Sequence, residues 1–259
     1  MARKRELLAA LAAIALAGCT SVRGLEAASI GARPAPDAGF LPAPDRMSPH
    51  AHAPFDRSWL APGVDLRDYS KVWVAPVDTA HVLPLSLWDR LNLRAPAVAS
   101  DLPRLARELH DDVVQAFSDD PQHRFEVLGG PLAVDGQSVV LEIALTELVP
   151  NKPVVGLVGL AAWAGPLQIG IPVATAAAFL QQGEVAFELR ARDGASRAVI
   201  AMAADRETGP MRVIDFRALT WYGNAHEIFR AWAREMVEVA DTPLDRPVPH
   251  ASYFTLLPW

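Results

Sequence analysis

The chain contains very little cysteine, since Cys19 is the only one among 259 residues. With one cysteine, neither an internal disulfide nor a site built from paired cysteines can form. A disulfide is also unnecessary, because a chain of this length buries enough surface to be stable without one. The apolar content of 51% is ample for one globular domain.

The chain also lacks an excess of positive charge. It has 24 Lys and Arg against 30 Asp and Glu, a formal net charge of −6, and no basic run beyond its first five residues. Residues 1–18 carry +2, which leaves −8 on the remainder. An acidic chain of this kind is not built to bind nucleic acid.

Sequence motifs of catalysis are missing as well. We find no glycine-rich phosphate loop, no nucleophile elbow and no His-Glu-x-x-His helix. His50 and His52 stand in a proline-rich stretch without a neighbouring carboxylate cluster, so we interpret them as polar linker residues and not as metal ligands. The prediction is a protein that is not an enzyme and needs neither cofactor nor metal.

The first residues have the order of a secretory signal peptide. A positive start at residues 3–5 is followed by an apolar run, Leu7–Ala17, and by the small residues before Cys19. The run is shorter than the roughly 20 residues of a membrane-spanning helix. Leu16–Cys19 resembles the lipobox of bacterial lipoproteins, which implies cleavage before Cys19 and acylation of that residue. The alternative is an ordinary signal peptide with Cys19 incidental.

The resemblance to lipoproteins extends to localisation. In that family an aspartate after the cysteine tends to retain the protein at the inner membrane, whereas this chain has Thr20. The resemblance therefore implies a lipid anchor in the outer membrane, with the protein facing the periplasm.

Composition divides the chain into three parts. Residues 1–18 form the signal peptide, residues 19–58 form the lipidated N-terminus and a flexible linker rich in proline and alanine, and residues 59–259 form the globular domain.

Apolar periodicity predicts strands and two helices. Strands are expected at 71–77, 125–128, 138–148, 183–192 and 197–205, with the first covered on both faces and Asp193-Gly194 forming a hairpin turn. One helix is expected to begin with Ser100 as N-cap. The other begins with Asn224 as N-cap and Glu227 completing a capping box, and ends before Pro243. The fold class is α+β: a single mixed, largely antiparallel sheet with helices packed on it.

Side-chain patterns define which faces are buried. The strand 138–148 and both helices carry an apolar face, formed by Val139, Leu141, Ile143, Leu145, Leu102, Leu105, Leu109, Val113, Phe117, Ile228, Phe229, Trp232, Met236 and Val237. The strand 183–192 alternates cleanly. Val185, Phe187 and Leu189 share one side, and the charged residues Glu184, Glu188, Arg190 and Arg192 share the other, which predicts a half-exposed strand.

A few charged residues invite a catalytic interpretation. His110-Asp111-Asp112 is expected on the solvent side of a helix, where charges are usually solvated. Asp193 is explained by its turn, and Asp205 is expected to pair with Arg206 at a strand end. If the protein were a hydrolase, Asp111, Asp193 or Asp205 would supply its carboxylates.

The segment 153–183 has no charged residue and is long enough to cross a membrane. Gly165-Pro166 and Gly170–Pro172 interrupt it, so neither half spans a bilayer as a helix. Three interpretations stay open: short apolar helices or turns packed over the sheet, a flap that contacts the membrane, or an oligomer contact.

Several stretches resemble a bacterial lipoprotein family known as domain of unknown function 3313. They are Gly39–Leu41, Val64–Val72, Pro76-Val77, Ala144–Pro150, Gly183–Glu188, Ala204–Arg206, Trp221 and Trp232-Ala233. Each is short, and their order carries the resemblance. Two features depart from the family: a shorter turn at 192–194 and a long uncharged insert before Gly183. The resemblance implies fold and location but no activity.

These observations favour a non-enzymatic cell-envelope lipoprotein, an assembly or scaffold factor at the periplasmic face of the outer membrane. Its expected partners are the membrane, through the lipid anchor, and an envelope protein, while homo-oligomerisation stays open. The alternatives are an oligomeric, membrane-inserting secretion or pore component that uses 153–183, and an envelope-acting hydrolase.

Overall fold

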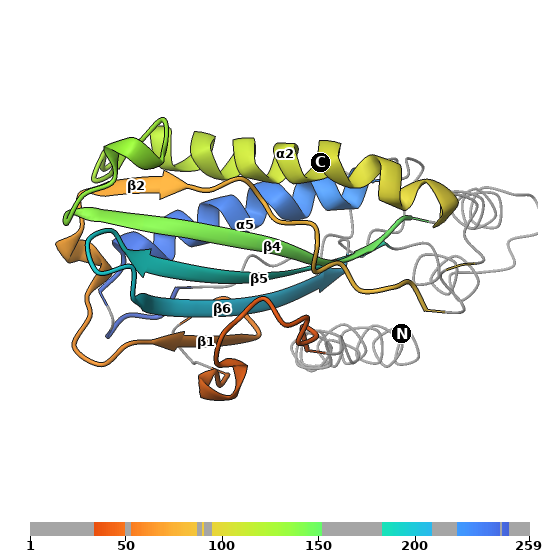
Figure 1. Ribbon diagram of the computed structural model, residues 1–259, viewed down its shortest axis with the longest axis horizontal. Helices are drawn as coiled ribbons and strands as arrows, with labels where there is room; N and C mark the ends of the chain where they lie inside the picture. The colour runs from red at the N-terminus through yellow and green to blue at the C-terminus, as the bar shows by residue number, and fades with distance from the viewer. Residues whose placement is uncertain are drawn as a thin grey trace, which may run out of the picture. The chain divides into compact units, whose positions relative to one another are not determined.

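The computed structural model describes residues 34–49, 53–86, 90, 95–151, 183–208, 222–243 and 245–248 (Figure 1). Six strands form one sheet in the order β1-β6-β5-β4-β2-β3, and two long helices accompany it. The bounds are β1 Arg57–Leu60, β2 Lys71–Val74, β3 Glu126–Val127, β4 Ser138–Val149, β5 Glu184–Asp193, β6 Val199–Thr208, α2 Val98–Ser118 and α5 Gly223–Asp241. Short 3₁₀ turns lie at Pro44–Arg46, Leu66–Asp68, Ala95–Ala97 and Pro131–Ala133. The predicted α+β fold class is confirmed.

The sheet is mixed. Its centre is antiparallel, because β4 pairs with β5 and β5 with β6 over nearly their whole length, and β1 adds an antiparallel edge. Among the described strands, both parallel pairs involve β2, which has β3 on one side and β4 on the other. The predicted hairpin is present, since β5 ends at Asp193 and Gly194 begins the turn that leads to β6.

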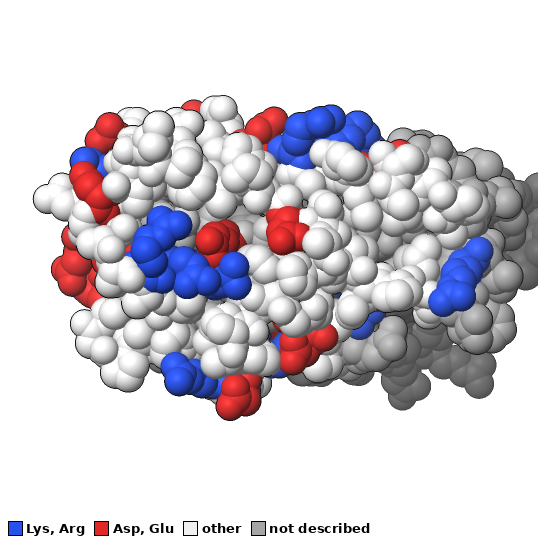
Figure 2. Space-filling view, in the orientation of Figure 1, with Lys and Arg blue, Asp and Glu red and all other residues white. Residues whose placement is uncertain are grey.

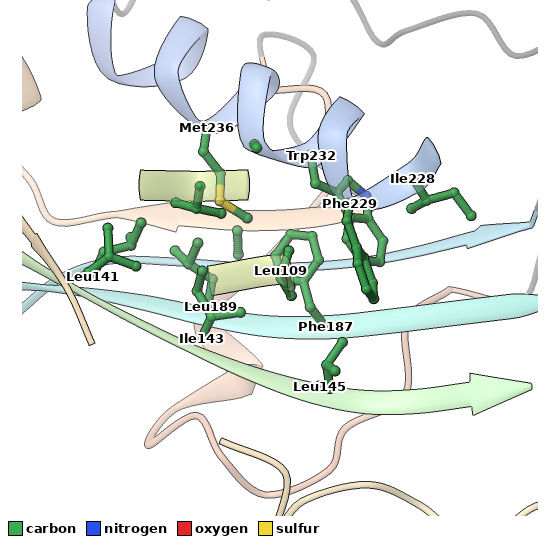
Figure 3. Packing of buried hydrophobic residues seen from close by; sticks show 14 of the residues in the cluster. Leu109, Leu141, Ile143, Leu145, Phe187, Leu189, Ile228, Phe229, Trp232 and Met236 are labelled. Carbon is green, nitrogen blue, oxygen red and sulfur yellow. The ribbon is translucent and has the colours of Figure 1, made fainter. Parts of the chain in front are cut away.

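The two helices lie side by side on one face of the sheet, and the main core fills the space between the layers (Figures 1 and 3). The predicted helix stripes are buried except Leu102, which is only partly buried. Phe187 of β5 meets Trp232 of α5 edge to face, with ring centroids 4.6 Å apart. Each large side chain of this kind contributes roughly 1.5–3 kcal/mol through burial, so these residues hold the helices on the sheet.

The helix starts differ from the prediction. Helix α2 begins two residues before Ser100, with Ala97 as N-cap, and the Ser100 hydroxyl donates to the Ala97 carbonyl. Tyr222 is the N-cap of α5, so Asn224 lies within the helix, where its buried amide has no hydrogen-bond partner. The capping predictions were wrong because packing of the first turn into the core decides where these helices start. The end of α5 before Pro243 is confirmed.

The flexible-linker prediction is wrong for residues 34–49 and 53–58. Four apolar side chains of this stretch, Ala35, Phe40, Leu41 and Met47, are buried on the sheet face opposite the helices, against Ala144, Met202 and Ala204. The alanines leave room on the strands for the larger side chains. We call residues 34–49 the covering segment.

The covering segment changes the environment of β5. Glu188 was expected on an exposed face, but it is fully buried and accepts hydrogen bonds from the backbone amides of Ala38 (3.2 Å) and Phe40 (3.1 Å). Arg190 donates to the Phe40 carbonyl at 2.8 Å. The predicted half-exposed strand is therefore wrong at Glu188, because a segment distant in sequence covers it.

Strand β2, in contrast, is less buried than predicted. Val72 and Val74 are buried, whereas Lys71 and Trp73 are only partly buried, so the strand is not covered on both faces as expected. The predicted shared face of β4 is confirmed, and a bulge after Leu145 brings Leu148 into the same core.

Several predicted features lie outside the described residues. These are the signal peptide, Cys19, His50, His52 and all but the last residue of the uncharged segment 153–183. Within the part of the chain that the structure describes, no helix has both the length and the apolar character needed to cross a membrane.

Candidate functional site

Asp205 is a carboxyl group held inside the protein. It lies on β6 and only 2% of it is exposed. One oxygen accepts a hydrogen bond from the Trp232 indole N–H at 2.7 Å, and the other accepts one from the backbone N–H of Asp56 at 3.0 Å. Burial, with smaller contributions from the charges of Glu207 and Asp56, raises the pKa of Asp205 to about 8.

The expected pairing of Asp205 with Arg206 is wrong. Consecutive residues of a strand point to opposite faces, so Arg206 lies on the other side of β6, where it forms ion pairs with Glu147 (2.8 Å) and Glu184. The strand also continues beyond Asp205 to Thr208. The two-residue period, which places Asp205 on the same face as the core residue Ala203, was the signal in the sequence that could have located it.

The three carboxylates considered for a hydrolase are not brought together. Asp193 is the last residue of β5, next to the β5–β6 turn, and it accepts hydrogen bonds from Ser196 and from the Tyr69 hydroxyl. The residue of β5 opposite Asp205 is Phe187, six positions from Asp193 and hence about 20 Å away along the strand. Asp111 is exposed on α2.

The His110-Asp111-Asp112 stretch lies on the solvent side of α2, as predicted. Asp111 is exposed, the other two are partly exposed, and His110 Nδ1 lies 3.0 Å from an Asp111 carboxylate oxygen. In the described ranges, no group of three or more potential ligands gathers closely enough to hold a metal ion.

The sheet face that carries the covering segment is lined with ion pairs. Arg190 and Arg192 both donate to one oxygen of Glu142, the second at 2.9 Å. Burial alone would raise the pKa of Glu142, but the two guanidinium groups outweigh it and lower the pKa. Figure 2 shows basic and acidic side chains next to each other over β4 and β5. These charges are engaged with one another, which leaves them poorly suited to catalysis.

A groove of about 780 Å³ runs between α2 and α5, and we call it the helix groove. Its charged lining residues are Asp112, Asp119, Asp120, Glu227, Glu238, Asp241, Arg230 and Arg234. Its apolar lining residues are Ala116, which is partly exposed, and the buried residues Ala233 and Val237. Partial burial, followed by the nearby charge of Glu108, raises the pKa of Asp112. A cation placed beside Asp112 would therefore be favoured.

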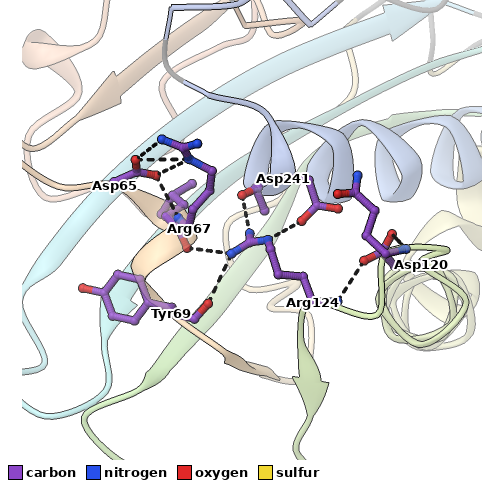
Figure 4. Close-up of polar contacts among 9 residues, drawn as sticks. Asp65, Arg67, Tyr69, Asp120, Arg124 and Asp241 are labelled. Atoms are coloured by element: carbon purple, nitrogen blue, oxygen red, sulfur yellow. Dashed lines mark hydrogen bonds and ion pairs between the residues drawn. The ribbon is translucent and has the colours of Figure 1, made fainter.

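Arg124 lies beside Asp241, a lining residue of the helix groove at the C-terminal end of α5 (Figure 4). Its Nε lies 2.6 Å from Asp241, and its guanidinium donates to the carbonyls of Ala240, Leu66 and Tyr69. A cation at this position also complements the negative end of the α5 dipole. Arg124 therefore fastens the C-terminal end of α5 to the loop before β2.

The fold and these sites define an α+β protein in which many of the described polar groups form hydrogen bonds and ion pairs within the fold. A family model described as "Protein of unknown function (DUF3313)" matches residues 36–236, so the chain belongs to this family. The family resemblance inferred from the sequence is confirmed.

Among solved structures, the chain is similar to the PelC dodecamer from Paraburkholderia phytofirmans and to protein XCC0632 from Xanthomonas campestris. The PelC match has 10% identity, covers 72% of this chain and 96% of PelC, and has a TM-score of 0.37. The XCC0632 match has 14% identity, covers 70% of this chain and 89% of that protein, and has a TM-score of 0.36. TM-scores this low support no inference about the function or assembly of this chain. No curated protein matches it.

Proposed function

We propose that this protein is a cell-envelope lipoprotein that acts as a non-enzymatic assembly or scaffold factor. A lipid on Cys19 holds it at the periplasmic face of the outer membrane, and the folded domain binds an envelope protein. The anchor is supported by the signal peptide and by the lipobox-like Leu16–Cys19.

The observation that carries the partner-binding role is the helix groove. Its carboxylates outnumber its arginines, and some of them are already used: Asp241 by Arg124, and Asp120 by backbone amides. Asp112 and Glu238 form no ion pair within the described residues. The groove therefore suits a partner segment that places lysine or arginine beside these two residues and an apolar side chain on Ala116.

The non-enzymatic character is supported by the roles of the three candidate carboxylates. Asp205 is enclosed by Trp232 and the Asp56 backbone, Asp193 stabilises a turn, and Asp111 is exposed on a helix. They lie on different elements, and no shared substrate position is formed among them.

In-cell photocrosslinking tests the partner-binding role. A photoreactive amino acid replaces Gln115, an exposed residue of the helix groove, and in a matched control it replaces Gln137, an exposed residue outside the groove. We expect a recurrent envelope protein from position 115 and not from position 137. The double change Asp112→Lys and Glu238→Lys should remove that product. Identical products from both positions would contradict the proposal.

Fatty-acid labelling tests the anchor. Cys19→Ser should abolish incorporation of a fatty-acid analogue, because serine has no thiol to form the thioether. The wild-type protein should sediment with outer membranes and stay there in high salt, since acyl burial does not depend on charge screening. Equal labelling of wild type and Cys19→Ser would show that the anchor assignment is wrong.

A further inference from the structure

An apolar cavity of about 380 Å³ lies between the sheet and the C-terminal half of α5. Its walls include Ala191, Ala201 and Ala203 on the strands and Met236 and Ala240 on the helix. Ala191 and Ala201 are directly opposite each other on β5 and β6. The methyl groups of these alanines do not reach α5, so the space between the layers stays open.

The same two layers are filled completely a few residues away. Farther along β5, the position corresponding to Ala191 is occupied by the large residue Phe187. Its ring packs against both Trp232 of α5 and Phe55, with centroid distances of 4.6 and 5.7 Å. Large aromatic residues at one end and alanines at the other therefore decide where the hollow lies. An apolar space within a core is normally costly, and an apolar ligand that fits it would offset this cost.

The lining of the cavity includes residues of the edge strand β1, and the cavity reaches the surface at its exposed lining residues. Arg46, whose guanidinium carbon lies 5.5 Å from the centre of the Trp59 ring, and Arg246 are exposed members of its lining. Neither arginine side chain forms an ion pair within the described residues. The site thus combines an apolar interior with two cations at its rim.

We propose that this cavity binds one acyl chain whose anionic head group contacts Arg46 and Arg246. Ligand sites usually measure about 300–1,000 Å³, and a volume near the lower limit suits a single chain. A soluble anion would make no use of the apolar walls, and a hydrocarbon would make no use of the arginines. This binding activity is independent of the scaffold function proposed above.

Two kinds of ligand present this chemistry, a free fatty acid and a lysophospholipid with an anionic head group. The test uses the full mature chain carrying Cys19→Ser, so that no detergent competes for the cavity. Isothermal titration calorimetry measures binding of palmitate, myristate, palmitoyl-lysophosphatidylglycerol and its zwitterionic phosphatidylcholine counterpart. We expect palmitate to bind with one-to-one stoichiometry and myristate to bind roughly tenfold more weakly, from the loss of two buried methylenes.

Two sets of variants locate the site. Ala191→Leu fills the cavity and should weaken binding at least tenfold, whereas Ala116→Leu adds the same atoms to the helix groove and should leave binding unchanged. Replacing both Arg46 and Arg246 by Gln should weaken binding of the anionic ligands about tenfold without changing the zwitterionic one. Arg107→Gln, an exposed arginine of α2, is the control. Because Arg46 and Arg246 are exposed, their replacement should not disturb folding. The arginine variant therefore tests the proposed site even if Ala191→Leu does not fold.

Binding of palmitate alone would identify a free fatty acid as the ligand, and binding of the lysophosphatidylglycerol would identify a membrane lipid. Either result supports the proposal. Failure of both to bind, or binding that a folded Ala191→Leu variant leaves unchanged, would overturn it. Equal affinity for the two lysophospholipids would overturn the assigned role of the arginines.

Discussion

At the residue scale, the buried carboxyl of Asp205 makes folding sensitive to pH. Its pKa rises from an ordinary value of 3.8 to about 8 in the folded protein. Between these values the folded state holds a proton that the unfolded chain has released, so the free energy of unfolding falls as pH rises. The slope is about 1.4 kcal/mol per pH unit.

Asp205→Asn should remove this dependence, because the amide resembles the protonated carboxyl but does not ionise. Urea unfolding at pH 5.0 and 7.5 measures it. Relative to the variant, the wild type should lose on the order of 3 kcal/mol over this interval. Taking the difference cancels other titrating groups, and a difference that is constant with pH would refute the assigned burial.

Arg124 is a second residue with a large expected effect. Arg124→Met would leave the Asp241 carboxylate, whose side chain is only 6% exposed, without its partner, together with the carbonyls of Ala240, Leu66 and Tyr69. Removing one member of a buried ion pair costs about 3–5 kcal/mol. Urea denaturation at pH 7 measures the loss. Arg67→Met, which breaks the exposed pair with Asp65, is the control and should change stability little.

At the scale of elements, the β5–β6 hairpin depends on a close approach between two chain segments. A Cβ added at Gly194 would lie 2.1 Å from the Asp135 carbonyl oxygen and 2.8 Å from that of Ser138, so the turn and the start of β4 meet at this glycine. Gly194 also donates its N–H to the Ser138 carbonyl at 2.8 Å. Both contacts involve backbone atoms, which cannot move aside as a flexible side chain would.

Gly194→Ala should therefore destabilise the protein by about 1–3 kcal/mol, the usual cost of overpacking. Gly136→Ala is a matched control, since its added Cβ would meet only the Ala195 methyl group at an ordinary 3.7 Å. Thermal unfolding of both variants measures the difference. Equal melting temperatures would show that the hairpin is not fixed at this point.

At the scale of the whole molecule, the folded unit extends to Pro34 on its N-terminal side. A fragment 34–259 should therefore unfold cooperatively at the same temperature as the mature chain. A fragment 59–259 loses the covering segment and Phe55. It also loses the backbone partners of Glu188 and the Asp56 amide that donates to Asp205.

The predicted loss is comparable to the whole stability of a domain. The large buried side chains Phe40, Leu41, Met47 and Phe55 contribute roughly 6–12 kcal/mol at 1.5–3 kcal/mol each, against a total stability of about 5–15 kcal/mol. Circular dichroism and thermal melting compare the two fragments. A cooperative transition in the fragment 59–259 at the wild-type temperature would show that the covering segment is dispensable.

The sequence by itself determined the type and order of both long helices and of every strand except β1, together with most of the core. The period of two in β5 and the helical period in α5 depend only on near neighbours in the chain, so Phe187 and Trp232 could be assigned to buried faces before their partners were known. The Asp193-Gly194 turn is likewise a local signal. The family assignment also came from short stretches in order.

Tertiary structure alone decided which polar residues are buried and what they contact. Glu188 has the same alternation as an exposed residue, and its burial depends on a segment about 150 positions away. Asp205 meets Trp232 and the Asp56 backbone only once β6, α5 and the segment before β1 have packed together. The apolar cavity exists because alanines on two strands face a helix that they do not reach. Such contacts join residues far apart in the chain, and local periodicity carries no information about them.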